Sequence, residues 1–128
     1  MLVFIQYPSK TTPENITAAF KLENIKEVTP VKASEEGFQF FVVIGSEDGG
    51  VDKGLASTEY STREEAEMAQ VTVVSIINAL SLFYTRYGHT PEHYGTTPVP
   101  FQVVNPETKE LEWGKVTFQN AGTLTVKI

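Results

Sequence analysis

The residue types best suited to chemistry gather in one segment, YTRYGHTPEHY, which runs from residue 84 to residue 94. It holds both histidines of the chain, three of its five tyrosines and an arginine. Tyrosine and arginine supply flat, rigid contact surface and hydrogen-bond donors, which protein-binding hot spots and nucleotide-stacking pockets both use. We therefore predict a binding site at Tyr84, Arg86, Tyr87, His89, His93 and Tyr94. The alternative is that these rings close one end of the core while their polar tips reach water.

The same segment contains a possible metal motif, because His89-Thr90-Pro91-Glu92-His93 matches the H-x-x-E-H signature of inverted zinc proteases. That chemistry needs both imidazoles on one face of a continuous helix. A proline in the middle of the motif opposes such a helix. We predict a surface loop here, with no bound metal and no cofactor.

Other catalytic patterns are missing from the sequence. The segment GSEDGGVDKG (residues 45–54) has carboxylates and glycines, but it lacks the spacing of a calcium-binding EF-hand loop or of a phosphate-binding P-loop. No G-x-S-x-G nucleophile elbow occurs. The absence of cysteine excludes a thiolate metal site, a cysteine nucleophile and disulfide bonds. These observations favour a non-enzymatic protein, and a small hydrolase using His89 or His93 is the weakest alternative.

Length and charge limit the class of protein further. The 128 residues are enough for a single domain with its own core, over residues 1–128. The net charge of −6 opposes binding to the phosphates of nucleic acid. No signal peptide is recognisable, and no stretch approaches eighteen uninterrupted apolar residues. We predict a cytoplasmic protein that binds neither nucleic acid nor membrane.

One long helix is the element that must position the 84–94 segment, because residues 61–87 show a strong helical period. Ser61 and Glu64 have the spacing of a capping box, and Gly88 is placed to end the helix. Polar residues form one stripe about a third of the circumference wide, so the helix must be covered on two or three sides. We expect one helix from Tyr60 to Arg86, with five buried residues: Val73, Ile76, Ile77, Leu80 and Phe83.

Strand patterns occur on both sides of this helix. Residues 2–7, 18–32, 38–44 and 55–60 precede it, and the second of these is interrupted at Glu23-Asn24, which predicts a bend or two short strands. The apolar run 38–44 predicts a central strand that is covered on both faces. After the helix, residues 101–105 read as a strand, and residues 110–118 and 123–128 as a hairpin. The order predicts an α+β fold with a mainly antiparallel sheet and one long central helix.

Two motifs carry a resemblance to a class of known proteins. These are F-x-L-x-N-I-K-x-V-T-P over residues 20–30, and Y-S-T-R-E-E-A-E leading into I-I-N-A-L over residues 60–80. Together with the strand FQFFVVI, they resemble small phage and prophage accessory proteins that place a meander of strands before one capped helix, in a pleckstrin-homology-like way. The resemblance covers about half of the chain and implies an accessory, anti-defence or immunity-type role, without implying any functional residue.

The expected partners follow from the amount of apolar surface. The helix and the 38–44 strand both need cover, and the C-terminal strands carry an apolar face of their own, since Trp113 lies opposite Val116 and Phe118 along the strand. The predicted solution is a symmetric homodimer. We therefore expect an interaction protein that binds a protein target as an oligomer, and the alternative is a protein that binds or sequesters a small nucleotide-like ligand.

Overall fold

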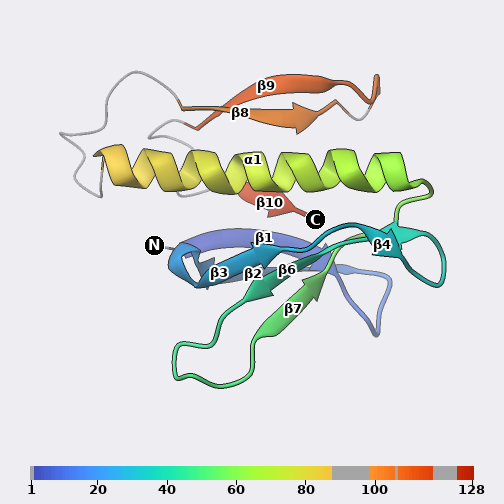
Figure 1. Ribbon diagram of the computed structural model, residues 1–128, viewed down its shortest axis with the longest axis horizontal. Helices are drawn as coiled ribbons and strands as arrows, with labels where there is room; N and C mark the ends of the chain where they lie inside the picture. Colours follow the sequence, from blue (N-terminus) through green and yellow to red (C-terminus); the bar gives the residue numbers. More distant parts are fainter. Residues whose placement is uncertain (1, 88–98, 106, 117–123) are drawn as a thin grey trace.

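The computed structural model describes residues 2–87, 99–105, 107–116 and 124–128, with only the backbone of residues 86 and 87. Within these residues the fold is α+β, with strands before and after one long helix, α1 (Arg63–Tyr87). Figure 1 shows α1 between the hairpin of β8 (Val99–Val104) and β9 (Leu111–Val116) on one side and the N-terminal strands on the other. The predicted fold class is confirmed, and the helix is covered on more than one side by its own chain.

Most of the N-terminal strands belong to two three-stranded sheets. In the first, β1 pairs antiparallel with β2 and parallel with a strand from the other end of the chain; its members are β1 (Leu2–Pro8), β2 (Asn15–Lys21) and β10 (Thr125–Lys127). The second is antiparallel, with the order β3 (Ile25–Val28), β6 (Phe41–Ile44) and β7 (Lys53–Ala56). A short 3-10 turn, Leu22–Asn24, joins β2 to β3. This turn is the interruption that the sequence predicts.

The predicted central strand is divided in the structure. β5 (Phe38–Gln39) pairs with β4 (Lys32–Ala33), β6 begins at Phe41, and Phe40 lies between them. Phe40 and Val42 are fully buried, but Phe41 on the opposite face is only half-buried, and the ammonium of Lys32 lies 5.3 Å from the centre of its ring. The prediction that both faces are fully covered is therefore wrong, because the outer face stays partly exposed and only a lysine side chain lies over it.

The helix begins later than predicted. Tyr60 exchanges two backbone hydrogen bonds with Phe38, of 2.8 and 2.9 Å, which keep its backbone extended. The capping residue is Thr62, whose hydroxyl accepts a hydrogen bond from the Glu65 N–H at 3.1 Å. Thr62 and Glu65 have the capping-box spacing that the sequence analysis assigned to Ser61 and Glu64. The predicted stop at Gly88 lies outside the described residues.

The predicted C-terminal hairpin is wrong. β9 pairs antiparallel with β8, whereas β10 pairs in parallel with β1. Each strand has an apolar face that needs a partner, and the sequence pattern does not say which strand supplies it. The predicted turn at residues 119–122 lies outside the described residues.

One hydrophobic core joins these elements. Of the five helix residues expected to be buried, Val73, Ile76, Leu80 and Phe83 are buried, while Ile77 is half-buried at the edge of the core. Strands from both sheets and from the hairpin contribute many of the other buried side chains, which include Ile5, Leu55, Phe101, Val116 and Val126, and Phe40 between β5 and β6 adds another.

Candidate functional site

The structure describes only part of the predicted tyrosine and histidine site. Tyr84 is half-buried on α1, packs against the core, and its ring meets that of Phe83 edge-on, with 5.5 Å between the ring centres. Arg86 and Tyr87 lie in the last turn of α1. His89, His93 and Tyr94 lie outside the described residues, so the predicted site stays a prediction.

Polar residues on one flank of α1 bind the extended segment between β3 and β4. The Gln70 amide donates to the carbonyl oxygen of Thr29 at 2.6 Å, and the Arg63 guanidinium donates to that of Val31 at 3.1 Å. Arg63 also lies over the ring of Phe38, 5.2 Å from its centre. These contacts hold the helix against the sheet of β3, so this part of the predicted polar stripe serves packing.

The remaining part of the stripe is exposed and includes apolar side chains. Val71, Val74 and Leu82 leave 41%, 37% and 61% of their surface to solvent. With Glu67 and Asn78, they form one line along the helix, at spacings of three and four residues.

The outer face of the hairpin continues this line. The Gln102 N–H of β8 donates to the hydroxyl of Ser75 at 2.9 Å, which places β8 along α1. In the hairpin, Phe101 is opposite Gly114 and is buried in the core, whereas Gln102 is opposite Trp113. Because side chains alternate along a strand, Trp113 faces away from the core. It leaves 70% of its surface exposed, and Leu111 on the same face leaves 45%.

We call this combined surface the apolar surface. It consists of Val71, Val74, Leu82, Leu111 and Trp113. On the helix circumference, Val71 and Leu82 lie within about 40° of Ser75, where the hairpin meets the helix. Val71 and Leu82 are therefore on the side of the helix nearer the hairpin, whereas Val74 lies on the side of β3.

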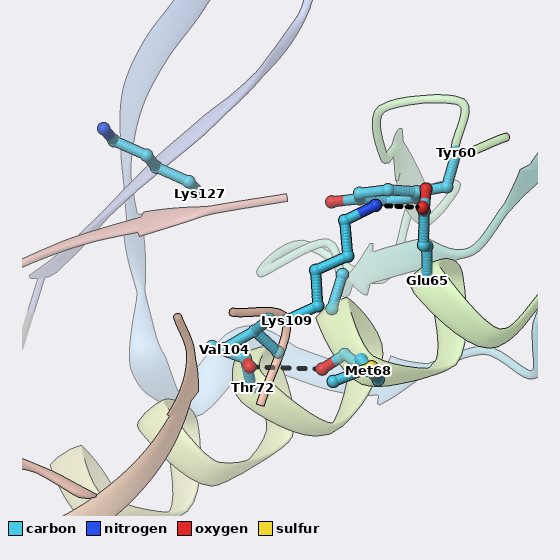
Figure 2. Close-up of a pocket in the computed structure, with 8 residues that line it drawn as sticks. Tyr60, Glu65, Met68, Thr72, Val104, Lys109 and Lys127 are labelled. Atoms are coloured by element: carbon cyan, nitrogen blue, oxygen red, sulfur yellow. Dashed lines mark hydrogen bonds and ion pairs between the residues drawn. The ribbon is translucent and has the colours of Figure 1, made fainter. Parts of the chain in front are cut away.

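A cavity of about 400 Å³ opens on another part of the molecule, between the first half of α1, the β8–β9 turn and β10 (Figure 2). Most of its wall is apolar or aromatic, and ionisable side chains lie at its rim; its lining is Tyr60, Glu65, Met68, Ala69, Thr72, Val104, Lys109 and Lys127. In Figure 2, the ammonium of Lys127 lies apart from Lys109 and Glu65. Cavities of this size, with an apolar wall and few polar groups, are typical of small-molecule sites.

The rim of the cavity has a defined electrostatic arrangement. The Lys109 ammonium donates to the Glu65 carboxylate at 2.7 Å. This hydrogen bond and the attraction of Glu65 raise the pKa of Lys109, so the side chain is charged at neutral pH. Burial raises the pKa of the Tyr60 phenol, against the opposing effect of a hydrogen bond with Thr58, so the phenol is neutral.

Metal-ligating side chains do not gather in the part of the chain that the structure describes. Aspartate and glutamate residues there form no group of three that could hold a metal ion. The acidic loop between β6 and β7 is tied by ion pairs instead: Lys26 contacts Asp52 at 3.2 Å, and Lys21 contacts Glu47 at 2.5 Å.

Sequence reasoning predicted excess apolar surface but did not identify the residues that form the apolar surface, and it missed the cavity. A signal for the first existed, since Val71, Val74 and Leu82 interrupt the polar stripe of the helix at regular spacing. The cavity had no such signal, because its lining comes from four separate segments of the chain.

Comparison with known proteins finds no matching family model, no matching curated protein and no matching solved structure.

Proposed function

We propose that this chain is a non-enzymatic interaction protein that forms a symmetric homodimer through the apolar surface. The observation that carries the proposal is the exposure of Trp113 on the outer face of the hairpin, together with that of Leu82 and Val71 on the helix. Trp113 alone leaves on the order of 150 Å² of ring surface in water. Exposed apolar side chains that gather in one place mark interaction sites, whereas scattered ones do not.

The order of residues along the helix favours a second copy of the chain as the occupant. The exposed line reads Glu67, Val71, Val74, Asn78, Leu82 and Thr85. If two copies pack antiparallel about a two-fold axis near residue 76, Val71 of each copy meets Leu82 of the other. Val74 meets Asn78, and Glu67 meets Thr85. The Val71–Leu82 pairs are then apolar on both sides, and no two like charges meet.

The parallel alternative is less favourable, because it places Glu67 opposite Glu67 of the other copy. A two-fold interface is also the commonest closed arrangement of identical chains. A stable interface buries at least ~1,000 Å² in total. We expect each copy to supply half of this area, from the exposed residues of its helix and from the outer face of its hairpin.

The helix itself raises a second possibility. By length and composition, Arg63–Thr85 is apolar enough to cross a membrane, and 33% of its most apolar window is buried. The hydrogen bonds from Arg63 and Gln70 to backbone carbonyls of the β3–β4 segment support the role of a core helix instead. We therefore keep a cytoplasmic location as part of the proposal.

The experiment is light scattering coupled to size exclusion at micromolar concentration. The wild-type protein should have twice the 14.2 kDa mass of one chain. A double variant, Leu82→Ser with Trp113→Ser, should have the mass of a monomer while its circular dichroism stays unchanged.

Val51→Ser is the matched control, since Val51 is 95% exposed and lies in the β6–β7 loop, away from the apolar surface. This variant should remain a dimer. A wild-type monomer at 50 μM would overturn the proposal, and so would a dimer that survives the double substitution; 50 μM here is about fifty times a typical micromolar dissociation constant.

The biological role that the resemblance implies, an accessory, anti-defence or immunity-type protein, remains a prediction. So does the alternative of a nucleotide-like ligand at the 84–94 segment.

A further inference from the structure

We propose that the cavity lined by Tyr60, Met68, Val104 and Lys109 binds a small amphiphile, a short apolar chain that ends in a carboxylate. The cavity and the apolar surface share no residue, although Val104 of the cavity is the cross-strand partner of Leu111 of the apolar surface.

The wall of the cavity determines the apolar part of the ligand. Met68 and Ala69 of α1 and Val104 of β8 supply aliphatic surface, and the Tyr60 ring supplies an aromatic one. Methionine adapts its shape to irregular apolar ligands, because its side chain is unbranched and flexible. The Thr72 hydroxyl donates to the carbonyl oxygen of Met68 at 3.1 Å, so its proton is already used within the helix.

The rim determines the charge of the ligand. An ammonium group has three donors, and the contact with Glu65 at 2.7 Å uses one of those of Lys109. Lys109 also has 63% of its side chain exposed, so an incoming anion can reach the remaining donors. The Lys109–Glu65 pair is neutral by itself, and the lining as a whole carries a charge of +1 because it also contains Lys127, whose ammonium lies apart from this pair (Figure 2).

The backbone at Lys109 supports a specific role for this lysine. Its φ angle is +60°, in the left-handed region that favours glycine. The turn around it is fixed by Asn105, whose side-chain oxygen accepts hydrogen bonds from the N–H groups of Glu107 and Thr108 at 2.8 and 3.2 Å. A lysine therefore occupies a position that glycine would fill with less strain, and its ammonium lies at the rim of the cavity.

The same lining disfavours a nucleotide. Recognition of a base edge needs several convergent donors and acceptors, and the described wall between Met68 and Val104 is aliphatic. A chain with one anionic end matches both the wall and the rim.

The experiment is a titration of the isotope-labelled protein with octanoate, followed by nuclear magnetic resonance of the backbone amides. We expect saturable shifts at Met68, Ala69 and Val104, with no change at the indole of Trp113. Acetate tests the anion alone, 1-octanol tests the chain alone, and adenosine monophosphate tests the nucleotide class.

The decisive variant is Lys109→Gly, because glycine suits the left-handed conformation and the fold should be kept. Its affinity for octanoate should fall about tenfold, to the level that the wild-type protein shows for 1-octanol. Lys10→Gly is the matched control, since Lys10 is exposed and lies in the β1–β2 loop; its affinity should not change.

Four results would overturn the proposal: no shifts at the cavity, equal binding of acetate and octanoate, equal affinity in Lys109→Gly, or tighter binding of adenosine monophosphate at the same amides. The last would assign the cavity to the nucleotide class instead.

Discussion

Ser57 is the buried polar side chain that the core accommodates among the described residues, with 2% of its surface exposed. Its hydroxyl accepts a hydrogen bond from the Phe40 N–H at 3.0 Å and donates to the Thr58 carbonyl oxygen at 2.9 Å. Phe40 lies at the break between β5 and β6, where no strand partner takes its N–H. Ser57 therefore makes the divided strand possible without leaving a buried donor unpaired.

This arrangement predicts the effect of Ser57→Ala. The substitution leaves the buried Phe40 N–H without an acceptor, which costs about 1–3 kcal/mol in the free energy of unfolding. Urea denaturation should show this loss. Ser34→Ala is the comparison, because Ser34 bonds to Glu59 at the surface, and it should change stability by no more than about 0.5 kcal/mol. Equal effects of the two substitutions would contradict the role assigned to Ser57.

At the scale of elements, two leucines of α1 distinguish its two sides. Leu80 is 1% exposed in the core and Leu82 is 61% exposed on the apolar surface. Leu80→Ala should lower the free energy of unfolding by about 2–5 kcal/mol, since it leaves a cavity. Leu82→Ala should change the stability of the single chain by less than about 0.5 kcal/mol. Urea denaturation at submicromolar concentration makes this comparison, and a loss of several kcal/mol in Leu82→Ala would mean that the helix is rotated from its described position.

The helix was predictable because its evidence is local. The apolar period, the acidic first turn and the cap all lie within one segment. The error at the start of the helix arose because two capping pairs overlap: Ser61 with Glu64, and Thr62 with Glu65 one residue later. The β1–β2 and β6–β7 pairings were predictable for the same reason, since their partners are neighbours in the sequence.

The C-terminal pairings were not predictable, because their partners are far apart. β9 and β10 look like a hairpin, yet β10 pairs with β1, more than a hundred residues away. Which strand β10 pairs with depends on how the whole core packs, and in that core Val126 of β10 and Ile5 of β1 are both fully buried. The cavity depends on the same long-range choice, because Lys127 comes from β10 and Lys109 from the β8–β9 turn. Its lining could therefore not be assembled from sequence.

For the whole molecule, Trp113 reports on assembly, since it is the single tryptophan of the chain and is 70% exposed. If the homodimer forms through the apolar surface, the indole leaves water on association. Its emission should then shift to shorter wavelength as concentration rises from 0.1 to 50 μM, a range that brackets a dissociation constant of about 1 μM. Acrylamide should quench it less in the dimer.

The Leu82→Ser variant provides the control for this measurement. It should keep the long-wavelength emission of an exposed indole across the same range. A wild-type spectrum that is independent of concentration, together with a dimer mass, would place Trp113 outside the interface and move that interface to another face.

The parallel pairing of β1 with β10 has a consequence for the chain while it is being made. One edge of β1 has no partner until Thr125–Lys127 leaves the ribosome, although β2 follows β1 after a few residues. Synthesis at about 5–20 residues per second makes this delay roughly ten seconds. During that time the nascent chain exposes an open strand edge from Phe4 to Gln6, which another chain could pair with. The β10-β1-β2 sheet can therefore close only once β10 has emerged, which is well after the helix.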